Sequence, residues 1–144
     1  MNSINWIKKK PVAHRGLHDG NKHVWENTLA AFSAAINRGF PIECDLHPTK
    51  DGVPVVFHDS PLKRLTGEEG HARDLTAKQI CALHIGGTKE RVPTLDEMLT
   101  HVAGKVPLVI ELKGDPGHDE GLVKAVGKSL SKYRGKAAIM SFDH

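Results

Sequence analysis

The chain has 144 residues, which suits one domain with a buried core, and its 39% hydrophobic and 26% charged residues are typical of a globular protein. The net charge of +3 is mild, and dense Lys/Arg blocks are missing, so we do not expect a nucleic-acid partner. No apolar run reaches the ~20 residues of a membrane span. The N-terminus does not resemble a signal peptide. The two cysteines, Cys44 and Cys81, do not have the spacing of a metal site, so we expect a cytoplasmic protein with reduced thiols.

Short apolar strands alternate with amphipathic helices along the chain. The pattern predicts strands at 11–14, 41–47, 53–59, 106–113 and 137–142. It predicts longer helices at 26–40 and 119–133, and shorter helices that begin at Thr76 and at Thr94. This alternation favours an α/β fold with a largely parallel sheet in a single domain spanning 1–144.

Helix ends carry recognisable capping residues. Asn27 or Thr28 can cap the helix at 26–40, and Gly39 can end it. Thr94 and Glu97 have the spacing of a capping box.

The connection after the second strand is too short to hold a helix. Either it returns as an extended segment, or the second and third strands form a hairpin around Asp51 and Gly52. In the hairpin we expect Asp45 to lie opposite His58, and both arrangements bring these two residues close together. Pro48 would disturb a strand that continued beyond His47.

Polar side chains close four of the five predicted strands: His14 ends the first, Glu43 and Asp45 the second, His58 and Asp59 the third, and Glu111 and Lys113 the fourth. Side chains two apart on a strand share a face, so Glu43, Asp45 and Glu111 can converge on one point. Such a cluster repels itself unless a cation compensates it, and oxygen ligands suit Mg²⁺ or Ca²⁺.

Basic and imidazole side chains surround the predicted carboxylate cluster. Arg15 and Lys113 suit the binding of a phosphate, and His14 and His58 suit proton transfer to and from its oxygens. The alternatives are structural: Arg15 can pair with a carboxylate, and Lys113 can be solvated at the strand end. We expect His47 to lie in a surface turn.

Several segments, in this order, resemble the glycerophosphodiester phosphodiesterase family: "AHRG", "ENTLAAF", "IECDLHPTKDGVPVVFHD", "RVPTLDEML" and "LVIELK". The resemblance implies a TIM-barrel enzyme that hydrolyses glycerophosphodiesters to sn-glycerol 3-phosphate and an alcohol. It implies that His14 and His58 act as acid and base and that Glu43, Asp45 and Glu111 bind the metal. It also implies that Arg15 and Lys113 bind the phosphate, with Glu26 in the loop beside the site.

A complete (β/α)₈ barrel typically needs ~250 residues, so we expect this chain to supply roughly the first five strands. It would then be a truncated barrel, or a half barrel that closes as a homo-oligomer. Two other functions stay open: an inactive half barrel that acts as a binding module, and a phosphodiesterase of the lysophospholipase D type.

Overall fold

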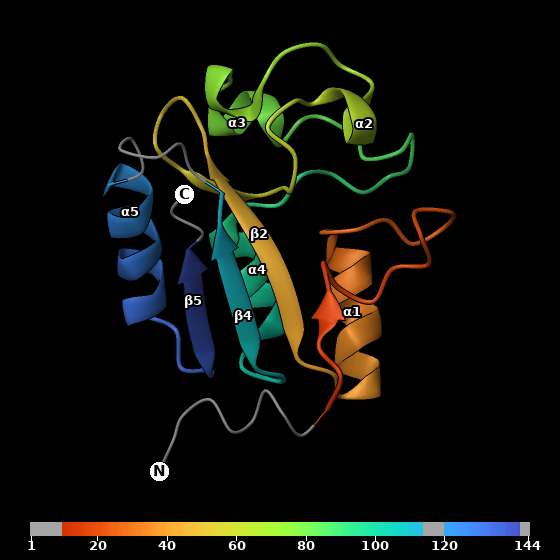
Figure 1. Ribbon diagram of the computed structural model, residues 1–144, viewed down its shortest axis with the longest axis vertical. Coiled ribbons are helices and arrows are strands. Elements are labelled where there is room, and N and C mark those ends of the chain that lie inside the picture. The colour runs from red at the N-terminus through yellow and green to blue at the C-terminus, as the bar shows by residue number, and fades with distance from the viewer. Residues whose placement is uncertain (1–9, 114–119, 142–144) are drawn as a thin grey trace.

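The computed structural model describes residues 10–113 and 120–141. In chain order the elements are β1 (Ala13–His14), α1 (Leu29–Arg38), β2 (Ile42–Pro48), β3 (Pro54–Val56), α2 (Lys63–Thr66), the 3₁₀ helix η2 (Ala72–Asp74), α3 (Ala77–Ile80), α4 (Leu95–Val102), β4 (Leu108–Leu112), α5 (Glu120–Ser131) and β5 (Ala137–Ser141). The strands form one sheet in the order β1-β2-β4-β5, all parallel, with β3 attached to β2 (Figure 1). The α/β prediction is confirmed. The first residue of the predicted 119–133 helix and the last of the predicted 137–142 strand lie outside the described residues.

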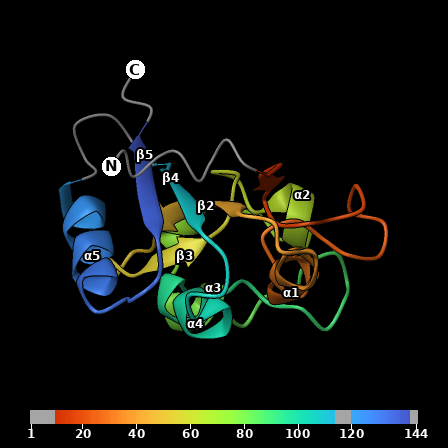
Figure 2. The same cartoon turned by 90° about the horizontal axis from the view of Figure 1, so that it is seen from below.

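Helices α1, α4 and α5 all lie on one side of the sheet, as the view from below shows (Figure 2). Alternation along β2 explains this arrangement. Ile42, Cys44 and Leu46 are fully buried in the main core beneath the helices. Glu43 and Asp45 point to the other face, because successive side chains on a strand alternate. The helices therefore cover the apolar face of the sheet, and Glu43 and Asp45 lie on the face that the helices do not cover.

Helix caps follow the sequence closely. Thr28 caps α1, with its side chain accepting from the backbone of Ala31, and Gly39 ends the helix in the left-handed conformation at φ 69°. Thr94 and Glu97 form the predicted capping box of α4. Each cap satisfies backbone N–H or C=O groups that a helix end otherwise leaves unpaired.

β2 and β3 form an antiparallel hairpin, which resolves the two alternatives for this connection. The predicted partner of Asp45 is wrong by one residue: Phe57, not His58, donates its N–H to the carbonyl of Asp45 at 2.9 Å. Pro48 does not interrupt β2 but ends it, paired with Pro54. A proline at the last position of a strand removes no ladder bond from its interior.

Residues 57–93, called here the inserted segment, leave the sheet after β3 and return beside it. The segment contains α2, η2 and α3. Together with Val55 of β3 it forms a second hydrophobic core, made of Val55, Phe57, Leu62, Leu65, Ala72, Ile80, Ile85 and Val92. Its return is fixed by the hydrogen bond from the N–H of Val56 to the carbonyl of Pro93, at 2.8 Å. In Figure 1 it lies beyond the carboxyl ends of β2 and β4.

Among the described strands, β1 and β5 each pair with one neighbour only. Ile139 and Met140 of β5 are each 46% exposed, which is high for large apolar side chains in a strand.

No described helix has the length and apolar character needed to cross a membrane.

Candidate active site

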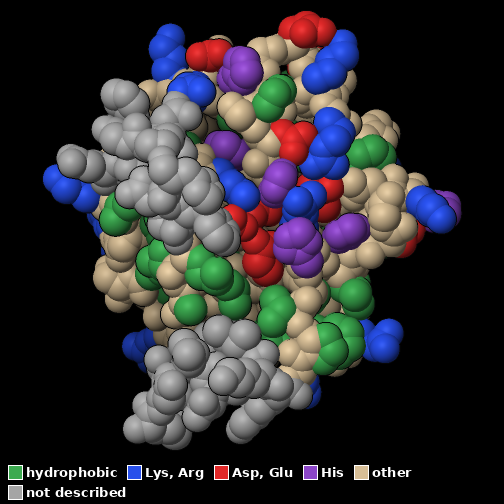
Figure 3. Space-filling view, in the orientation of Figure 1, with side chains coloured by type: hydrophobic (Ala, Val, Ile, Leu, Met, Phe, Trp, Pro, Cys, Tyr) green, Lys and Arg blue, Asp and Glu red, His purple; other side chains and the backbone are tan. Residues whose placement is uncertain are grey.

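Three carboxylates meet beside the carboxyl ends of β1 and β4. Glu43 and Asp45 lie within β2 and do not close it as the sequence predicted, because the hairpin with β3 extends β2 to Pro48. Parallel pairing places Asp45 beside Glu111, and Glu43 lies one pleat earlier on the same face of β2. One oxygen from each of the three carboxylates lies within 4.8 Å of the others. Figure 3 shows acidic, histidine and basic side chains gathered on this face.

Asp45 has an oxygen that lacks a partner at the centre of this cluster. Its side chain is completely buried, and among the described residues its Oδ1 accepts no hydrogen bond. Its Oδ2 accepts from the Asn27 amide at 3.1 Å and lies 3.7 Å from the Nε of Arg15. A buried carboxylate oxygen without a donor is costly, and oxygen ligands suit a hard divalent cation. The residues present therefore fit Mg²⁺ or Ca²⁺.

The electrostatics of the cluster also favour a cation. Burial, together with the neighbouring Asp45 and Glu111, raises the pKa of Glu43 well above its usual value. Burial also works against ionisation of Glu111, but hydrogen bonds with Lys113, Glu43 and Asp45 and the charge of Lys113 together outweigh it and lower the pKa of that carboxyl. Two adjacent carboxylates thus have opposite tendencies, as expected where negative charges share a site.

Arg15 lies in the turn that follows β1. Its backbone has a φ of 60°, and its N–H donates to the Oε1 of Glu43 at 3.1 Å. The next residue, Gly16, has a φ of 80°, and a Cβ there would lie 2.7 Å from the Cβ of Ala31. Only glycine allows this close approach to α1 without strain. The turn therefore holds Arg15 against the carboxylate cluster.

Glu26 lies behind Arg15 and is only 2% exposed. Its carboxylate accepts from the Nη1 of Arg15 at 3.2 Å, from the amide of Asn21 at 2.8 Å, and from two nitrogens of Arg64 at 2.8 and 2.9 Å. Burial opposes its charge, but the donors from Arg64, Asn21 and Arg15 prevail and lower its pKa to about 2. All of these contacts are with protein groups, so its substrate-binding role stays a prediction.

His58 follows β3 and is oriented by its neighbour. Its Nδ1 lies 2.9 Å from Asp59, which also accepts two hydrogen bonds from Arg64. Those bonds, chiefly from Arg64, outweigh burial and lower the pKa of Asp59 to about 2. Because an ionised carboxylate only accepts hydrogen bonds, the Nδ1 of His58 carries a proton, and its Nε2 is left for other partners.

His47 does not lie in a simple surface turn, which corrects the sequence-based expectation. Its ring is largely buried on the same face of β2 as Asp45, and its Nε2 donates to the carbonyl of His58 at 2.8 Å. Burial is the main cause of its lowered pKa. The residue thus fixes the backbone that carries His58.

His14 and Lys113 complete the set of predicted residues. His14 ends β1 with its side chain 64% exposed, and its Nε2 lies 3.8 Å from the Oε1 of Glu43. Lys113 follows β4 and donates to Glu111 at 2.9 Å. Sequence reasoning missed Asn27 as a partner of Asp45 and missed Arg64 entirely. It found Asp59 at the end of the third strand but gave it no role in the site.

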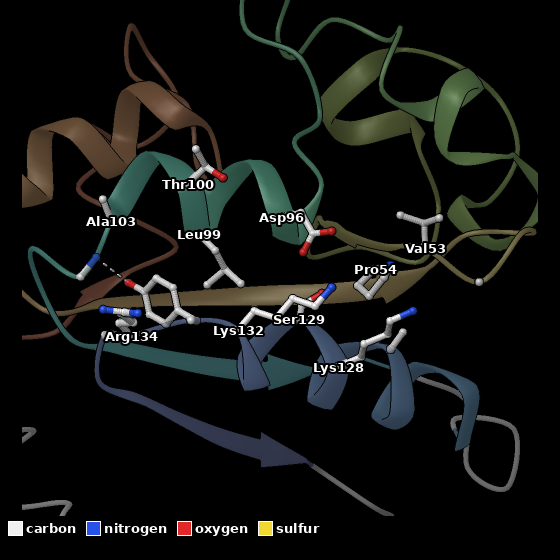
Figure 4. A pocket seen from close by; sticks show the side chains of 15 residues that line it. Val53, Pro54, Asp96, Leu99, Thr100, Ala103, Lys128, Ser129, Lys132 and Arg134 are labelled. Carbon is white, nitrogen blue, oxygen red and sulfur yellow. Dashed lines mark hydrogen bonds between the residues drawn. The ribbon is translucent and has the colours of Figure 1, made fainter.

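The described residues also line a cavity of about 900 Å³ away from this cluster. Leu99 and Thr100 of α4 lie on one side of it, and Lys128 and Ser129 of α5 lie on the other (Figure 4). The Tyr133 hydroxyl accepts from the Gly104 N–H at its edge. The described residues that line this cavity include no member of the carboxylate cluster.

Comparison with known proteins identifies the family. The model of the glycerophosphoryl diester phosphodiesterase family matches residues 14–144. The chain belongs to this family. A glycerophosphodiester phosphodiesterase of Caldanaerobacter subterraneus subsp. tengcongensis is 39% identical over 150 residues, which cover 96% of this chain and 60% of that protein.

Two further family members extend the comparison. A phosphodiesterase of Oleispira antarctica, solved in complex with the product sn-glycerol-3-phosphate, matches with a TM-score of 0.83 and 28% identity, over 92% of this chain and 57% of that structure. A lysophospholipase D of Rattus norvegicus is 32% identical over 136 residues, which cover 85% of this chain and 41% of that protein. The chain therefore spans about half the length of the relatives it matches.

Proposed function

We propose that this chain carries the catalytic residues of a metal-dependent phosphodiesterase that hydrolyses glycerophosphodiesters to sn-glycerol 3-phosphate and an alcohol. The observation that supports it best is the convergence of Glu43, Asp45 and Glu111 within 4.8 Å, with the backbone N–H of Arg15 bonded to Glu43. The proposal also rests on the family and on the product bound to the Oleispira antarctica relative.

Glu43, Asp45 and Glu111 would hold the divalent cation. The buried Oδ1 of Asp45, which has no donor among the described residues, is the oxygen best placed for it. A cation bound there neutralises phosphate charge and stabilises the charge that develops during hydrolysis. Mg²⁺ and Ca²⁺ both suit this set of oxygens.

His14 and His58 would move the protons. The attacking oxygen, of water or of a neighbouring substrate hydroxyl, forms the new bond to phosphorus and loses its proton to one imidazole. Attack by the hydroxyl would give a cyclic phosphodiester, which water would then open to sn-glycerol 3-phosphate. The other imidazole gives a proton to the alcohol oxygen as its bond to phosphorus breaks. His58 suits either role because Asp59 binds its Nδ1 and leaves Nε2 for substrate.

Arg15 and Lys113 would bind the phosphate. Arg15 is held by Glu26, and its planar guanidinium offers further N–H groups that suit phosphate oxygens. Lys113 pairs with Glu111 and adds a second positive charge at the same edge of the sheet. The two cations would therefore orient the diester between the two imidazoles.

The test is release of sn-glycerol 3-phosphate from glycerophosphocholine by this chain, with Mg²⁺ or Ca²⁺ and then with chelator. We expect release that chelator abolishes, and a loss of ~10²–10⁴-fold in His58→Ala, because general acid–base catalysis contributes that much. His84→Ala is the matched control, since His84 is exposed in the inserted segment and bonds the carbonyl of Thr88.

Two outcomes of the assay decide between the alternative functions, and a third measurement gives the oligomeric state. A folded chain that binds the metal but releases no product would contradict the proposal and favour a binding module. Faster cleavage of lysophosphatidylcholine than of glycerophosphocholine would favour the lysophospholipase D type. Sedimentation of the same sample shows whether the active species is a monomer or a homo-oligomer.

We also propose a cytoplasmic location, since both cysteines are free in the described part of the chain.

A further inference from the structure

Arg64 of α2 binds two carboxylates at once. Its Nε and Nη2 donate to the two oxygens of Asp59 at 2.8 and 2.9 Å. Its Nη1 and Nη2 donate to the two oxygens of Glu26 at 2.8 and 2.9 Å. Paired, nearly parallel hydrogen bonds of this kind fix orientation as well as distance. Arg64 therefore sets how the two carboxylates lie relative to each other.

Each of these carboxylates also binds a residue of the candidate active site. Asp59 accepts from the Nδ1 of His58 at 2.9 Å. Glu26 accepts from the Nη1 of Arg15 at 3.2 Å. His58 and Arg15 come from different parts of the chain, one after β3 and the other after β1, and Arg64 connects them through Asp59 and Glu26.

We propose that Arg64 is a positioning residue that holds His58 through Asp59 and Arg15 through Glu26, so that the proton-transferring and phosphate-binding side chains keep one relative geometry. The inference rests on the proposed function for the roles of His58 and Arg15. The positioning itself is independent of turnover. It gives the inserted segment, which carries Arg64, a part in aligning the site.

The chemistry of the guanidinium explains why an arginine is needed there. Glu26 and Asp59 are both ionised and would repel each other without a cation between them. A lysine supplies the same charge as a compact point with three donors, and it cannot present a planar fork to two carboxylates. Arg64→Lys is therefore a specific variant: it keeps the charge and removes the geometry.

NMR of the metal-loaded chain tests both connections, or arms: Arg64 to His58 through Asp59, and Arg64 to Arg15 through Glu26. Long-range ¹H–¹⁵N spectra report the tautomer of His58, and the Nε–H signal reports the environment of Arg15. In the unaltered protein we expect the Nδ1–H tautomer of His58 to dominate. In Arg64→Met and in Arg64→Lys we expect a mixture of tautomers and a shifted Arg15 signal. Lys63→Met is the matched control, since Lys63 lies on the same helix and bonds the exposed Glu69.

Single-arm variants make the test specific. Asp59→Asn should change the His58 signal and leave that of Arg15, while Glu26→Gln should do the reverse. If Arg64→Met fails to fold, Arg64→Lys decides the question. Unchanged signals of both residues in a folded Arg64 variant would overturn the proposal, and so would a change in one arm alone. Where turnover is measurable, kcat should fall about 100-fold in Arg64→Lys, as expected for a small misplacement of reacting groups.

Failure of the proposed function gives a different result. A chain without turnover but with the expected NMR changes keeps Arg64 as the positioning residue and removes only the enzymatic role of the residues it holds. If the unaltered chain turns over substrate but the Arg64 variants show unchanged NMR signals, the positioning role of Arg64 is wrong and the proposed enzymatic function stands.

Discussion

Glu43 shows how strongly a cluster of buried carboxylates disfavours the charge of one member. Its carboxyl is nearly buried, faces Asp45 and Glu111, and has a pKa well above its usual value. A carboxyl of this kind holds a proton at neutral pH until a positive charge displaces it. Metal binding and proton release are therefore coupled at this residue.

We predict that binding of Mg²⁺ or Ca²⁺ at pH 7 releases about one proton, because the cation must displace the proton of Glu43. The measurement is titration calorimetry in two buffers with different ionisation enthalpies, such as HEPES and Tris. The apparent binding enthalpy should differ between them. In Glu43→Gln the buffer dependence should vanish, and equal heats in the two buffers for the unaltered chain would contradict the prediction.

Local patterns in the sequence predict some residues of the site and miss others for a physical reason. Glu43, Asp45 and Glu111 can be found because carboxylates that interrupt an apolar strand are visible in a short stretch of sequence. Arg64 cannot be found in this way, since its partner Glu26 is 38 residues away and the contact depends on how the inserted segment folds back. Tertiary contacts between loops have no local signal.

At the level of elements, α4 supports the strands that carry the carboxylates. It begins at the Thr94–Glu97 capping box and buries Leu95, Met98 and Val102 in the main core. The bond from the N–H of Glu97 to the Thr94 hydroxyl satisfies one of the unpaired donors at the start of the helix. The position of the sheet thus depends in part on one hydroxyl.

We predict that Thr94→Ala lowers the free energy of unfolding by about 1 kcal/mol, the usual cost of losing a side-chain cap. Urea denaturation followed by circular dichroism measures it. Thr100→Ala is the control on the same helix: Thr100 is exposed, so its replacement should change stability by less than about 0.5 kcal/mol. Equal effects of the two substitutions would show that the cap contributes nothing.

Most strands and helix caps could be predicted from the sequence, but the connection between β2 and β3 could not, because it depends on a contact between strands. Four of the five predicted strands lie in the parallel sheet, and the caps at Thr28 and Thr94 lie where the sequence indicates. The β2–β3 connection stayed ambiguous because its short polar turn suits a hairpin or an extended return equally. Only the pairing of Leu46 with Val56 decides it, and that is a contact between strands.

At the scale of the whole molecule, the described residues form two hydrophobic cores, one between the sheet and its helices and one centred on the inserted segment. Buried and partly buried ion pairs connect them: Arg64 of the inserted segment binds Glu26, which precedes α1. Glu26 has its pKa lowered from 4.5 to about 2, and that of Asp59 is lowered from 3.8 to about 2. Because these folded-state values are depressed, the pairs stabilise the fold above pH 4.5, and that stability is lost as the pH falls through about 2.

We predict that the free energy of unfolding falls between pH 5 and pH 2, and that this dependence is flatter in Glu26→Gln, which has no carboxyl to protonate there. Urea unfolding at a series of pH values measures both slopes. Glu69→Gln, which removes the exposed partner of Lys63, should keep the slope of the unaltered chain. A Glu26→Gln slope as steep as that of the unaltered chain would contradict the prediction.

The return of the inserted segment to its point of departure has a consequence for how this fold can vary. The segment leaves after Val56, and Pro93 comes back to bond the same residue. Because its two ends meet and residues 67–71 are exposed, the chain can lengthen or shorten at that exposed turn without moving a strand. Such changes would leave the three carboxylates and Arg15, which lie outside the segment, in their places.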